Sequence, residues 1–413
     1  MSKAKISLHP LTEEKLPQGW RLIPIGDVIV ESQYGMNESA SSNGNTAIIG
    51  MKNIQDGIIE TNSLTRVDID DDEKKKYLLS SGDILINRTN SYDLVGKVGI
   101  FDSKQEAVFA SYLVRLLADK KLVNEWYMNY WLNSYIAQKT LKRIATKAIS
   151  QANINPTEFK KHCYIPLPSL SEQEQIILIL KCWDKAILGT QTLIELKTKQ
   201  KQWLMRNLLT GKKRVKGFSE PWNEYHLSEL FINRIETGYD DLPLLSITRK
   251  EGVINRDDVN RKNTSSNDKS KYLRICEGDI GYNTMRMWQG VSSLSSIEGI
   301  VSPAYTICTP KKGVHGKFMS YLFKYPKTIH LFYRYSQGLT SDTWNLKFKH
   351  FQEIKVTMPN EDEQKAISNI LELCDKELGI LESQLKSIKK QKLGLMQKLL
   401  VGDITVAANK EVA

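Results

Sequence analysis

The sequence predicts a mixed α+β protein with an internal pseudo-two-fold repeat, in which two similar α/β units are separated by two long antiparallel coiled-coil helices. Three observations predict this fold class. A phrase near residue 200 returns 191 positions later, each copy carries apolar residues at heptad spacing, and the stretches ahead of the two copies echo each other. Repeats are considered first because they decide how the rest of a chain is divided.

The clearest repeat is "QKQWLMRNLLTG" at 200–211, which returns as "QKLGLMQKLLVG" at 391–402. At the same offset the match continues backwards without a gap and pairs "PSLSEQEQIILILKCWDKAI" with "PNEDEQKAISNILELCDKEL". Sixteen of the 44 positions in 168–211 are identical to their partners, far more than chance would give. The chain is therefore predicted to be a tandem duplication.

Both copies of the repeated segment are predicted to be long helices. Their apolar stripes alternate spacings of four and three, a period that keeps one face toward a partner helix. The first stripe consists of Ile176, Leu180, Trp183, Ile187, Thr190, Ile194, Lys197, Lys201, Leu204 and Leu208. The second consists of Ile367, Leu371, Cys374, Leu378, Leu381, Leu385, Ile388, Lys392, Leu395 and Leu399. Each copy ends at a glycine, Gly211 or Gly402, as helices commonly do.

The connectivity of the chain predicts how these helices pair. The first helix must lead from the first unit to the second, so a helix related to it by a two-fold axis must run back. An antiparallel pair inside one chain is expected, and a dimerising coiled coil or an ordinary bundle is the alternative. The predicted boundaries are 1–168 for the first unit, 169–211 for the first spacer helix, 212–359 for the second unit, 360–402 for the second spacer helix and 403–413 for a mobile tail.

The two units share a frame but differ between the frame segments. "KKYLLSSGDILIN" at 75–87 parallels "SKYLRICEGDIGYN" at 270–283, and "NINPTEF" at 153–159 parallels "NLKFKHF" at 345–351. The stretches that follow the first of these pairs, "RTNSYDLVGKVGIF" and "TMRMWQGVSSLSS", do not match. Similar scaffolds that carry different loops are what two recognition units need in order to read two different targets.

Composition narrows the class of partner. With 413 residues the chain is too long for a single core. Its net charge of +11 favours an acidic partner, nucleic acid first and an anionic membrane second. Five cysteines without a C-x-x-C pair indicate neither a disulfide framework nor a zinc ribbon. No signal peptide or membrane-spanning run is recognisable, so we expect a cytoplasmic protein without a membrane partner.

The motifs of common nucleic-acid enzymes are missing from the sequence. It contains no Asn/Asp-Pro-Pro-aromatic loop for methyl transfer and no G-x-x-x-x-G-K-[ST] phosphate loop. Asp72, Glu73 and Lys74 are clustered on a polar stretch that is typical of a solvated turn, and the histidines lack metal-ligand spacing. We therefore predict a non-catalytic binding module with no cofactor and no metal.

In the order of its motifs, nearly the whole chain resembles the specificity subunit of type I restriction-modification systems. The resemblance rests on "LPQGW", "GDILINRTNSYDLVGKVGIF", "ANINPTEFKKHCYIPLPSLSEQEQI" and "KQKQWLMRNLLTGKKRV", followed by a second cycle through "MPNEDEQKAI" and "KQKLGLMQKLLVG". The second cycle departs slightly, with "VTMP" where the first has "IPLP".

The resemblance implies two target recognition domains, each of which reads one half of an interrupted double-stranded DNA target from the major groove. It also implies that the two helices fix the gap between the half-sites and dock two methyltransferase (modification) subunits. Restriction subunits that hydrolyse ATP would join through the methyltransferase core. Two domains on one face of B-DNA would touch major grooves about 34 Å apart, which predicts an interrupted target.

Residues that read bases are expected among polar and basic side chains on the divergent loops, because base-edge contacts carry the sequence information. The candidates in the first domain are Tyr34, Asn37, Lys52, Asn53, Asn87, Arg88, Thr89, Asn90, Ser91, Tyr92, Lys97, Ser150, Gln151 and Asn153. Those in the second domain are Tyr239, Arg249, Lys250, Asn283, Thr284, Arg286, Trp288, Gln289, Ser341, Asp342 and Thr343. Candidates for docking the partner subunits are Leu193, Leu196, Met205 and Met396. A structural role is the alternative for each residue.

Two other functions fit the same sequence. One is a specificity subunit of another methyltransferase-based defence system. The other is a coiled-coil scaffold with two protein-binding domains, for which the basic charge would be incidental. Binding that weakens steeply with salt would mark the DNA reading, and salt-insensitive binding to protein would mark the scaffold.

Overall fold

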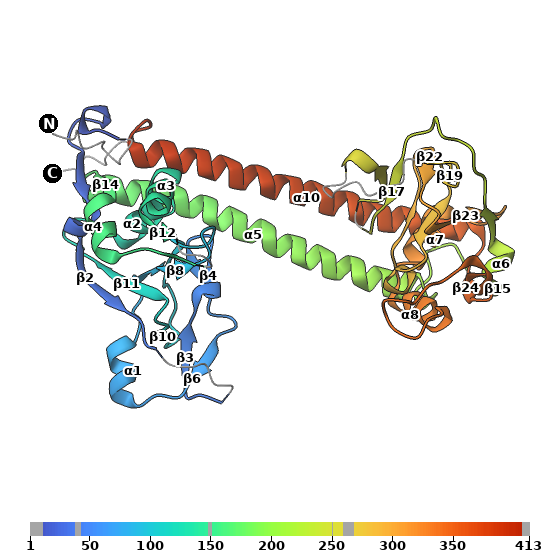
Figure 1. Ribbon diagram of the computed structural model, residues 1–413, viewed down its shortest axis with the longest axis horizontal. Helices are drawn as coiled ribbons and strands as arrows, with labels where there is room; N and C mark the ends of the chain where they lie inside the picture. The colour runs from blue at the N-terminus through green and yellow to red at the C-terminus, as the bar shows by residue number, and fades with distance from the viewer. Residues whose placement is uncertain (1–10, 38–42, 148–150, 250, 259–267, 407–413) are drawn as a thin grey trace. The chain divides into compact units, whose positions relative to one another are not determined.

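The computed structural model describes residues 11–37, 43–147, 151–249, 251–258 and 268–406. The chain divides into two compact units. Unit 1 comprises Met1–Thr190 and Gln384–Ala413, and unit 2 comprises Gln191–Ser383. Each unit combines an α+β body with part of each of two long helices, α5 (Leu170–Leu208) and α10 (Glu361–Val401), as Figure 1 shows. The predicted mixed fold with two long helices is confirmed.

Each long helix begins at a side chain that caps its first turn. The Glu172 amide donates to Ser169 Oγ at 3.3 Å, and Glu172 Oε2 accepts from the Ser169 amide at 3.1 Å. This reciprocal pair satisfies two backbone donors that a helix start leaves open. At the start of α10, the Glu363 amide donates to Asn360 Oδ1 at 3.0 Å. The acidic residues of both first turns also suit the positive end of the helix dipole.

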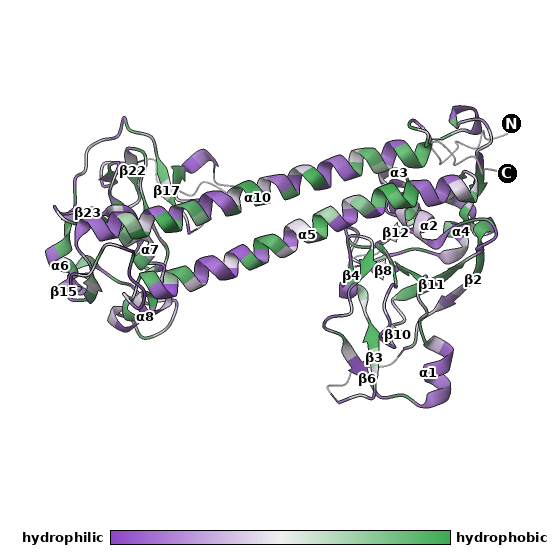
Figure 2. Cartoon of the chain, turned by 180° about the vertical axis from the view of Figure 1, so that it is seen from behind, coloured by the Kyte–Doolittle hydropathy of each residue, from purple (hydrophilic) through white to green (hydrophobic). Residues whose placement is uncertain are grey.

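The predicted stripes are the inner faces of these helices. In unit 1, Ile176 and Leu180 from the start of α5 share a core with Leu399 and Leu400 from the end of α10. In unit 2, the end of α5 and the start of α10 share a core in the same way. Every stripe position is buried or half-buried. Figure 2 shows the corresponding alternation of hydrophobic and hydrophilic residues along both helices.

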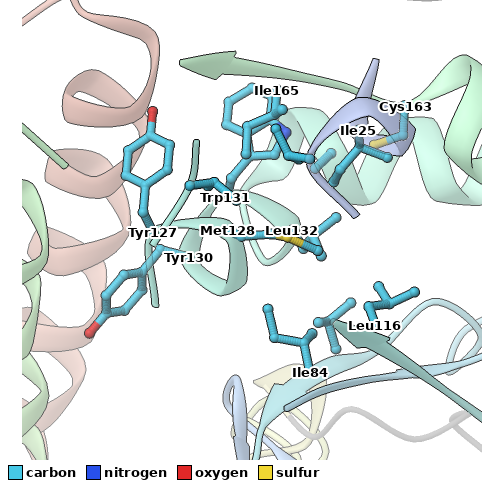
Figure 3. Packing of buried hydrophobic residues seen from close by; sticks show 14 of the residues in the cluster. Ile25, Ile84, Leu116, Tyr127, Met128, Tyr130, Trp131, Leu132, Cys163 and Ile165 are labelled. Atoms are coloured by element: carbon cyan, nitrogen blue, oxygen red, sulfur yellow. The ribbon is translucent and has the colours of Figure 1, made fainter. Parts of the chain in front are cut away.

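The body of unit 1 is organised around a six-stranded sheet with the order β2-β11-β7-β9-β5-β4. Its strands are β2 (Ile29–Tyr34), β11 (Leu113–Ala118), β7 (Ile84–Asn87), β9 (Val98–Ile100), β5 (Ile58–Ile59) and β4 (Ile54–Gln55). Helix α2 (Glu125–Leu132) packs against strand β9 of this sheet, and most of its residues are buried as a result. Figure 3 shows side chains of α2 gathered with others from the sheet and from β14, namely Met128, Trp131, Leu132, Ile84, Leu116 and Ile165.

Smaller sheets and helices complete unit 1. One pair joins β1 (Arg21–Pro24) to β14 (Tyr164–Leu167), a second sheet has the order β10-β3-β6, and a third has the order β12-β13-β8. The strands of the last two sheets are β10 (Val108–Phe109), β3 (Thr46–Ile49), β6 (Thr65–Val67), β12 (Thr146–Lys147), β13 (Ala152–Asn153) and β8 (Thr89–Asn90). The remaining α-helices of this body are α1 (Asp71–Tyr77), α3 (Tyr135–Ile144) and α4 (Pro156–His162).

Unit 2 repeats the frame of unit 1. Its main sheet has the order β16-β23-β20-β21, in which β23 is antiparallel to both neighbours as β11 is in unit 1. These strands are β16 (Phe231–Arg234), β23 (Tyr305–Pro310), β20 (Ile280–Asn283) and β21 (Ser292–Leu294). The paired strands are β15 (Asn223–His226) with β24 (Lys355–Met358), β17 (Leu245–Ile247) with β18 (Val253–Asn255), and β19 (Leu273–Ile275) with β22 (Gly299–Val301). The helices are α6 (Leu227–Leu230), α7 (Gly316–Leu322), α8 (Pro326–Tyr335) and α9 (Phe348–Phe351).

A buried glutamine joins each body to its long helix. Gln173 Oε1 accepts from the Asn124 amide at 2.8 Å, and Gln364 Oε1 accepts from the His315 amide at 2.8 Å. Asn124 and His315 are the residues that precede α2 and α7. Gln364 lies 191 positions after Gln173, and His315 lies 191 positions after Asn124. The duplication therefore preserved this joint as well as the helix sequence.

A second joint uses an aspartate on the long helix. In unit 1, the Tyr130 hydroxyl donates to Asp184 Oδ2 at 2.6 Å, and Lys392 donates to the other carboxylate oxygen. In unit 2, the Tyr321 hydroxyl donates to Asp375 Oδ2 at 2.6 Å, and Lys201 completes the group. Each lysine comes from the long helix of the other repeat, so both joints also hold α5 and α10 together within their unit.

Candidate nucleic-acid interface

In unit 1 the fold brings together two segments that the sequence analysis selected separately. Strand β8 follows β7 directly, and β13 precedes α4, yet the two strands pair antiparallel. The Ile154 amide donates to the Arg88 carbonyl at 2.8 Å, and Thr89 Oγ1 donates to Asn153 Oδ1 at 2.6 Å. Residues 88–90 and 152–154 therefore lie side by side, and Arg88, Asn90 and Asn153 form the part of them that reaches the surface.

A cavity of about 810 Å³ lies beside this surface. Four candidates from separate parts of the chain line it: Asn37, Lys52, Asn90 and Lys97. Met36, Met51, Leu94 and Tyr112 supply its apolar lining. Amide groups offer donors and acceptors for base edges, apolar groups suit a thymine methyl, and ammonium groups suit phosphate.

An arginine–aromatic pair belongs to the same unit. The Arg88 guanidinium carbon lies 4.9 Å from the centre of the Tyr34 ring, and Tyr34 is half exposed. Stacking of this kind holds the planar group in one orientation and leaves its outer N–H groups free to donate. The guanidinium fork is the side chain that most often reads guanine in the major groove.

Three other candidates of unit 1 are buried. Asn53 Oδ1 accepts from the Gly50 amide at 2.9 Å, and Thr89 is bonded to Asn153 as described above. The hydrogen bonds of these side chains are used within the fold, so neither residue is free to contact a base. Asn87 is fully buried at the end of β7, and neither atom of its amide has a hydrogen-bond partner among the described residues.

The remaining candidates of unit 1 lie on its surface. Those exposed to solvent are Ser91, Tyr92, Gln151 and Asn153. Ser150 lies outside the described residues.

In unit 2 the two segments equivalent to 88–90 and 152–154 also meet. The Leu346 amide donates to the Thr284 carbonyl at 2.8 Å, which is the counterpart of the bond between Ile154 and Arg88 in unit 1. The Trp288 and Trp344 rings meet edge to face, with centres 5.1 Å apart. The turn at 283–289 and the loop at 337–345 therefore lie side by side, although more than 45 residues separate them in the chain.

The candidates of unit 2 differ in solvent exposure and in whether their polar groups are already hydrogen-bonded within the fold. Arg249 and Arg286 are exposed, as are Ser341, Asp342 and Thr343 on the loop. The Thr284 hydroxyl donates to the Ala304 carbonyl at 3.0 Å, and Asn283 Oδ1 accepts from the Met285 amide at 2.9 Å. Trp288 and Gln289 are half-buried, and Lys250 lies outside the described residues.

Tyr239 has a partner that the sequence analysis missed. The Arg274 guanidinium carbon lies 4.6 Å from the centre of the Tyr239 ring. Arg274 also forms ion pairs with Glu236 and Glu298. The hydrogen bond to Glu298, followed by that to Glu236, raises the pKa of Arg274. The hydrogen bond from Arg274 in turn lowers the pKa of Glu236. No local sequence pattern indicates this network, because its members come from separate strands and loops.

The docking candidates on the long helices separate into two classes. Leu193 and Leu196 are 40% and 57% exposed. Met205 is half-buried against the core of unit 2, and Met396 is only 5% exposed within the core of unit 1. Both methionines occupy core positions because they lie beside the stripe, so the exposed leucines are the better candidates.

Two further properties concern the described part of the chain. Within those ranges, no group of three or more His, Cys, Asp and Glu side chains is placed so that it could hold a metal ion. None of the described helices is both long enough and apolar enough to cross a lipid bilayer.

Comparison with known proteins identifies the family. The model of the type I restriction modification DNA specificity domain matches this chain twice, over residues 17–198 and 220–390. The chain belongs to this family. The two matches contain the two bodies and most of both long helices, so the duplication seen in the sequence is a duplication of the specificity domain.

Relatives and solved structures agree with this assignment. The predicted specificity subunit of the type I restriction enzyme MjaX from Methanocaldococcus jannaschii is 27% identical over 418 residues, with 95% of each chain covered. The MjaVIII specificity subunit of the same organism is 22% identical, with 95% of this chain and 94% of that protein covered. The S subunit of a type I restriction-modification system from M. genitalium has the same fold, with a TM-score of 0.57, 17% identity and coverage of 94% and 98%.

A second solved structure comes from work on complex assembly and conformational transition of the type I restriction-modification system. It has a TM-score of 0.56 and 14% identity, with 94% of this chain and 99% of that chain covered. At these identities the structures show the common fold of specificity subunits.

Proposed function

We propose that this specificity-family chain is the DNA sequence-recognition subunit of a type I restriction-modification complex. Unit 1 reads one half of an interrupted double-stranded target, and unit 2 reads the other half. In unit 1 the residues that read bases are Asn37, Asn90 and Arg88, and Lys52 and Lys97 contact the phosphate backbone of the DNA. In unit 2 they are Arg286 and the exposed loop residues 341–343.

One observation carries this proposal. The duplicated frame repeats the same joints to the long helices, whereas the two segments that meet in each unit have different side chains. Beside these segments, unit 1 places the amides and lysines that line its cavity, with Arg88 over the Tyr34 ring. Unit 2 places the Trp288 and Trp344 rings edge to face, with Arg286 exposed. A frame that is kept while its contact surface changes is expected of a protein that holds two readers for two different sequences.

The exposed leucines of the long helices support the second half of the proposal, in which the helices dock two methyltransferase subunits. An amphipathic helix of a partner can bury such side chains. Restriction subunits would join through the methyltransferases, and the assembled complex would work in the cytoplasm. The chemistry then resides in the partner subunits, and this chain contributes specificity.

Docking can be tested with charges placed on the helix. We expect Leu193→Asp/Leu196→Asp to reduce co-purification of the methyltransferase subunit at least tenfold, because burying an unpaired carboxylate is costly. Leu339→Asp is the matched control, since Leu339 is fully exposed on a loop of the same unit. Unchanged recovery of the partner with the helix variant would argue against docking at this face.

The decisive experiment is a genome-wide map of methylated adenine in cells that carry the partner methyltransferase, with and without this chain. A new interrupted motif with two short halves should appear only when the chain is present. Unchanged methylation by an active partner would contradict the proposal and favour a protein-binding scaffold. In that case, binding of the chain to its partner should be insensitive to salt.

A further inference from the structure

Two lysines of unit 1, neither of them among the candidates above, gather on the ring of the candidate Tyr92. Lys147 Nζ lies 3.8 Å from the centre of the Tyr92 ring, and Lys142 Nζ lies 5.4 Å from it. Two ammonium groups on one ring repel each other, and no ion pair among the described residues includes either of them. The nearest compensating charge is that of Asp93, which acts on Lys142 from the next position along the loop.

The loop that carries Tyr92 is fixed on helix α3. Lys142 Nζ donates to the carbonyls of Tyr92 and Asp93, the latter at 2.7 Å. Gln138 Nε2 donates to the Gly96 carbonyl at 2.9 Å. Gly96 has a φ of +83°, and a Cβ there would lie 3.3 Å from both Leu141 and Ile154. The backbone of this loop and the Lys142 side chain are therefore held in place before any ligand arrives.

The second lysine is tied to the candidate interface through a sheet. Lys147 is the cross-strand neighbour of Ala152, which is in turn the neighbour of Asn90 beside the cavity. Two strand spacings place Lys147 and Asn90 roughly 10 Å apart. The major groove of DNA is about 12 Å wide, so one sheet can present a reader to the groove and a cation to its rim.

We infer that Lys142, Lys147 and Tyr92 form an anchor for a DNA backbone phosphate in unit 1. An anionic oxygen between the two ammonium groups relieves their repulsion, and the Tyr92 hydroxyl adds a donor. Burial lowers the pKa of Lys142, and the nearby charge of Asp93 opposes this effect only in part. The inference rests on the proposed DNA-binding function and deepens it, because it assigns the backbone contact to these residues.

The anchor is particular to unit 1. Counted by the repeat offset of 191, Lys142 corresponds to Tyr333 on α8. Tyr333 packs against Trp344 with ring centres 4.9 Å apart. Unit 2 therefore places an aromatic cluster where unit 1 places cations, and we expect unit 1 to contribute more of the salt dependence of DNA binding.

The test measures how binding of the full-length chain to a fluorescent random-sequence duplex changes between about 50 and 200 mM salt. Lys142→Gln/Lys147→Gln should reduce the slope of log affinity against log salt by about 0.9, because the anchor binds one phosphate and each phosphate contact contributes roughly 0.9. Its matched control is Lys75→Gln/Lys76→Gln, which removes two exposed charges from α1 of the same unit. The control should leave the slope unchanged.

Two more variants separate an anchor from a structural role of Lys142. Lys147→Gln alone leaves the loop bonds of Lys142 in place and should reduce the slope by about 0.5, because one of the two ammonium groups on the phosphate remains. Tyr92→Leu removes the shared ring and should weaken binding to every duplex, whereas Tyr92→Phe should be milder. Preference for the methylated motif over random DNA should stay constant, since phosphate contacts do not read sequence.

Each contrary result has a definite meaning. An unchanged slope in the double lysine variant, or an altered motif preference at constant slope, would overturn the anchor while leaving DNA recognition in place. Absence of DNA binding by the unmodified chain with its methyltransferase partner would overturn the proposed function and the anchor together.

Discussion

At the scale of single residues, Asp184 and Asp375 do more than pair with a lysine. Each also accepts a hydrogen bond from a tyrosine of the adjoining body. Burial and the bond to Asp184 raise the pKa of Tyr130 far above its ordinary value, so its hydroxyl remains a donor throughout the usable pH range. One carboxylate thereby fixes both a helix partner and a body in position.

The tyrosine bond can be removed without changing the packing. We expect Tyr130→Phe to lower the free energy of unfolding by about 1 to 2 kcal/mol, because a hydrogen bond to a charged acceptor is lost. Tyr135→Phe is the control, since Tyr135 is 59% exposed. Urea denaturation measures both, and equal values for the two variants would mean that the Asp184 joint adds no stability.

His315 predicts a dependence of stability on pH. Burial is the main cause that lowers its pKa below the ordinary value of 6.5. The unfolded chain therefore binds a proton at a higher pH than the folded chain, and acid favours unfolding. The urea midpoint should fall as the pH drops below about 6.5 and should level off once the folded histidine is also protonated.

The repeat itself supplies the control for this effect. His315→Asn installs the residue that unit 1 has at the equivalent position, Asn124, which caps α2 through its side chain. This variant should lose part of the decline between pH 7.5 and pH 5.5. An identical decline in both proteins would assign the acid sensitivity to other groups.

At the scale of elements, the long helices have two sets of apolar side chains that differ in burial. The heptad stripe faces the interior of each unit, and a second set of apolar side chains faces solvent. The larger members of the exposed set are Leu178, Leu188, Leu193, Leu196, Trp203, Leu373, Ile380 and Leu393. A helix with this much exposed apolar surface is suited to further helical partners.

Two neighbouring leucines of α10 distinguish these surfaces. Leu371 is fully buried and Leu373 is 65% exposed. We expect Leu371→Ala to destabilise the protein by about 2 to 5 kcal/mol, because it leaves a cavity in the core. Leu373→Ala should change stability by no more than about 0.5 kcal/mol. Thermal and urea unfolding measure both, and comparable losses would show that the stripe does not carry the helix packing.

At the scale of the whole molecule, the proposed function makes the two units separate readers on a duplicated frame. The residues that join the bodies to the long helices obey the offset of 191, including Gln173 with Gln364 and Asp184 with Asp375. The side chains at the contact surfaces do not obey it. Changes in one contact surface should therefore leave the other reader intact.

This independence can be measured in the methylation motif. Arg88→Gln should relax one half of the motif, and Arg286→Gln should relax the other half. Each lost guanidinium fork should reduce discrimination at its base by about 1 to 3 kcal/mol. Sequencing of methylated genomic DNA gives both halves in one experiment. A change in both halves from either single variant would contradict separate reading.

The candidate site was predictable in part. The divergent stretches after 87 and 283 and before 154 and 346 are readable from the sequence, because the frame matches on both sides of them. Which side chains face outward was not readable. Asn53 and Thr89 are buried, and Lys142 and Lys147 escaped notice because they lie on a helix and a strand outside those stretches.

The sequence by itself determined the duplication, the two long helices and their inner stripes, since a period of 3.5 residues and a helix cap are local properties of the chain. Tertiary structure decided the cavity beside β8, the exchange of lysines between repeats, and the two ammonium groups on the Tyr92 ring. These features depend on strands and helices that are distant in sequence, and side-chain contacts between such segments exist only once the backbone has folded.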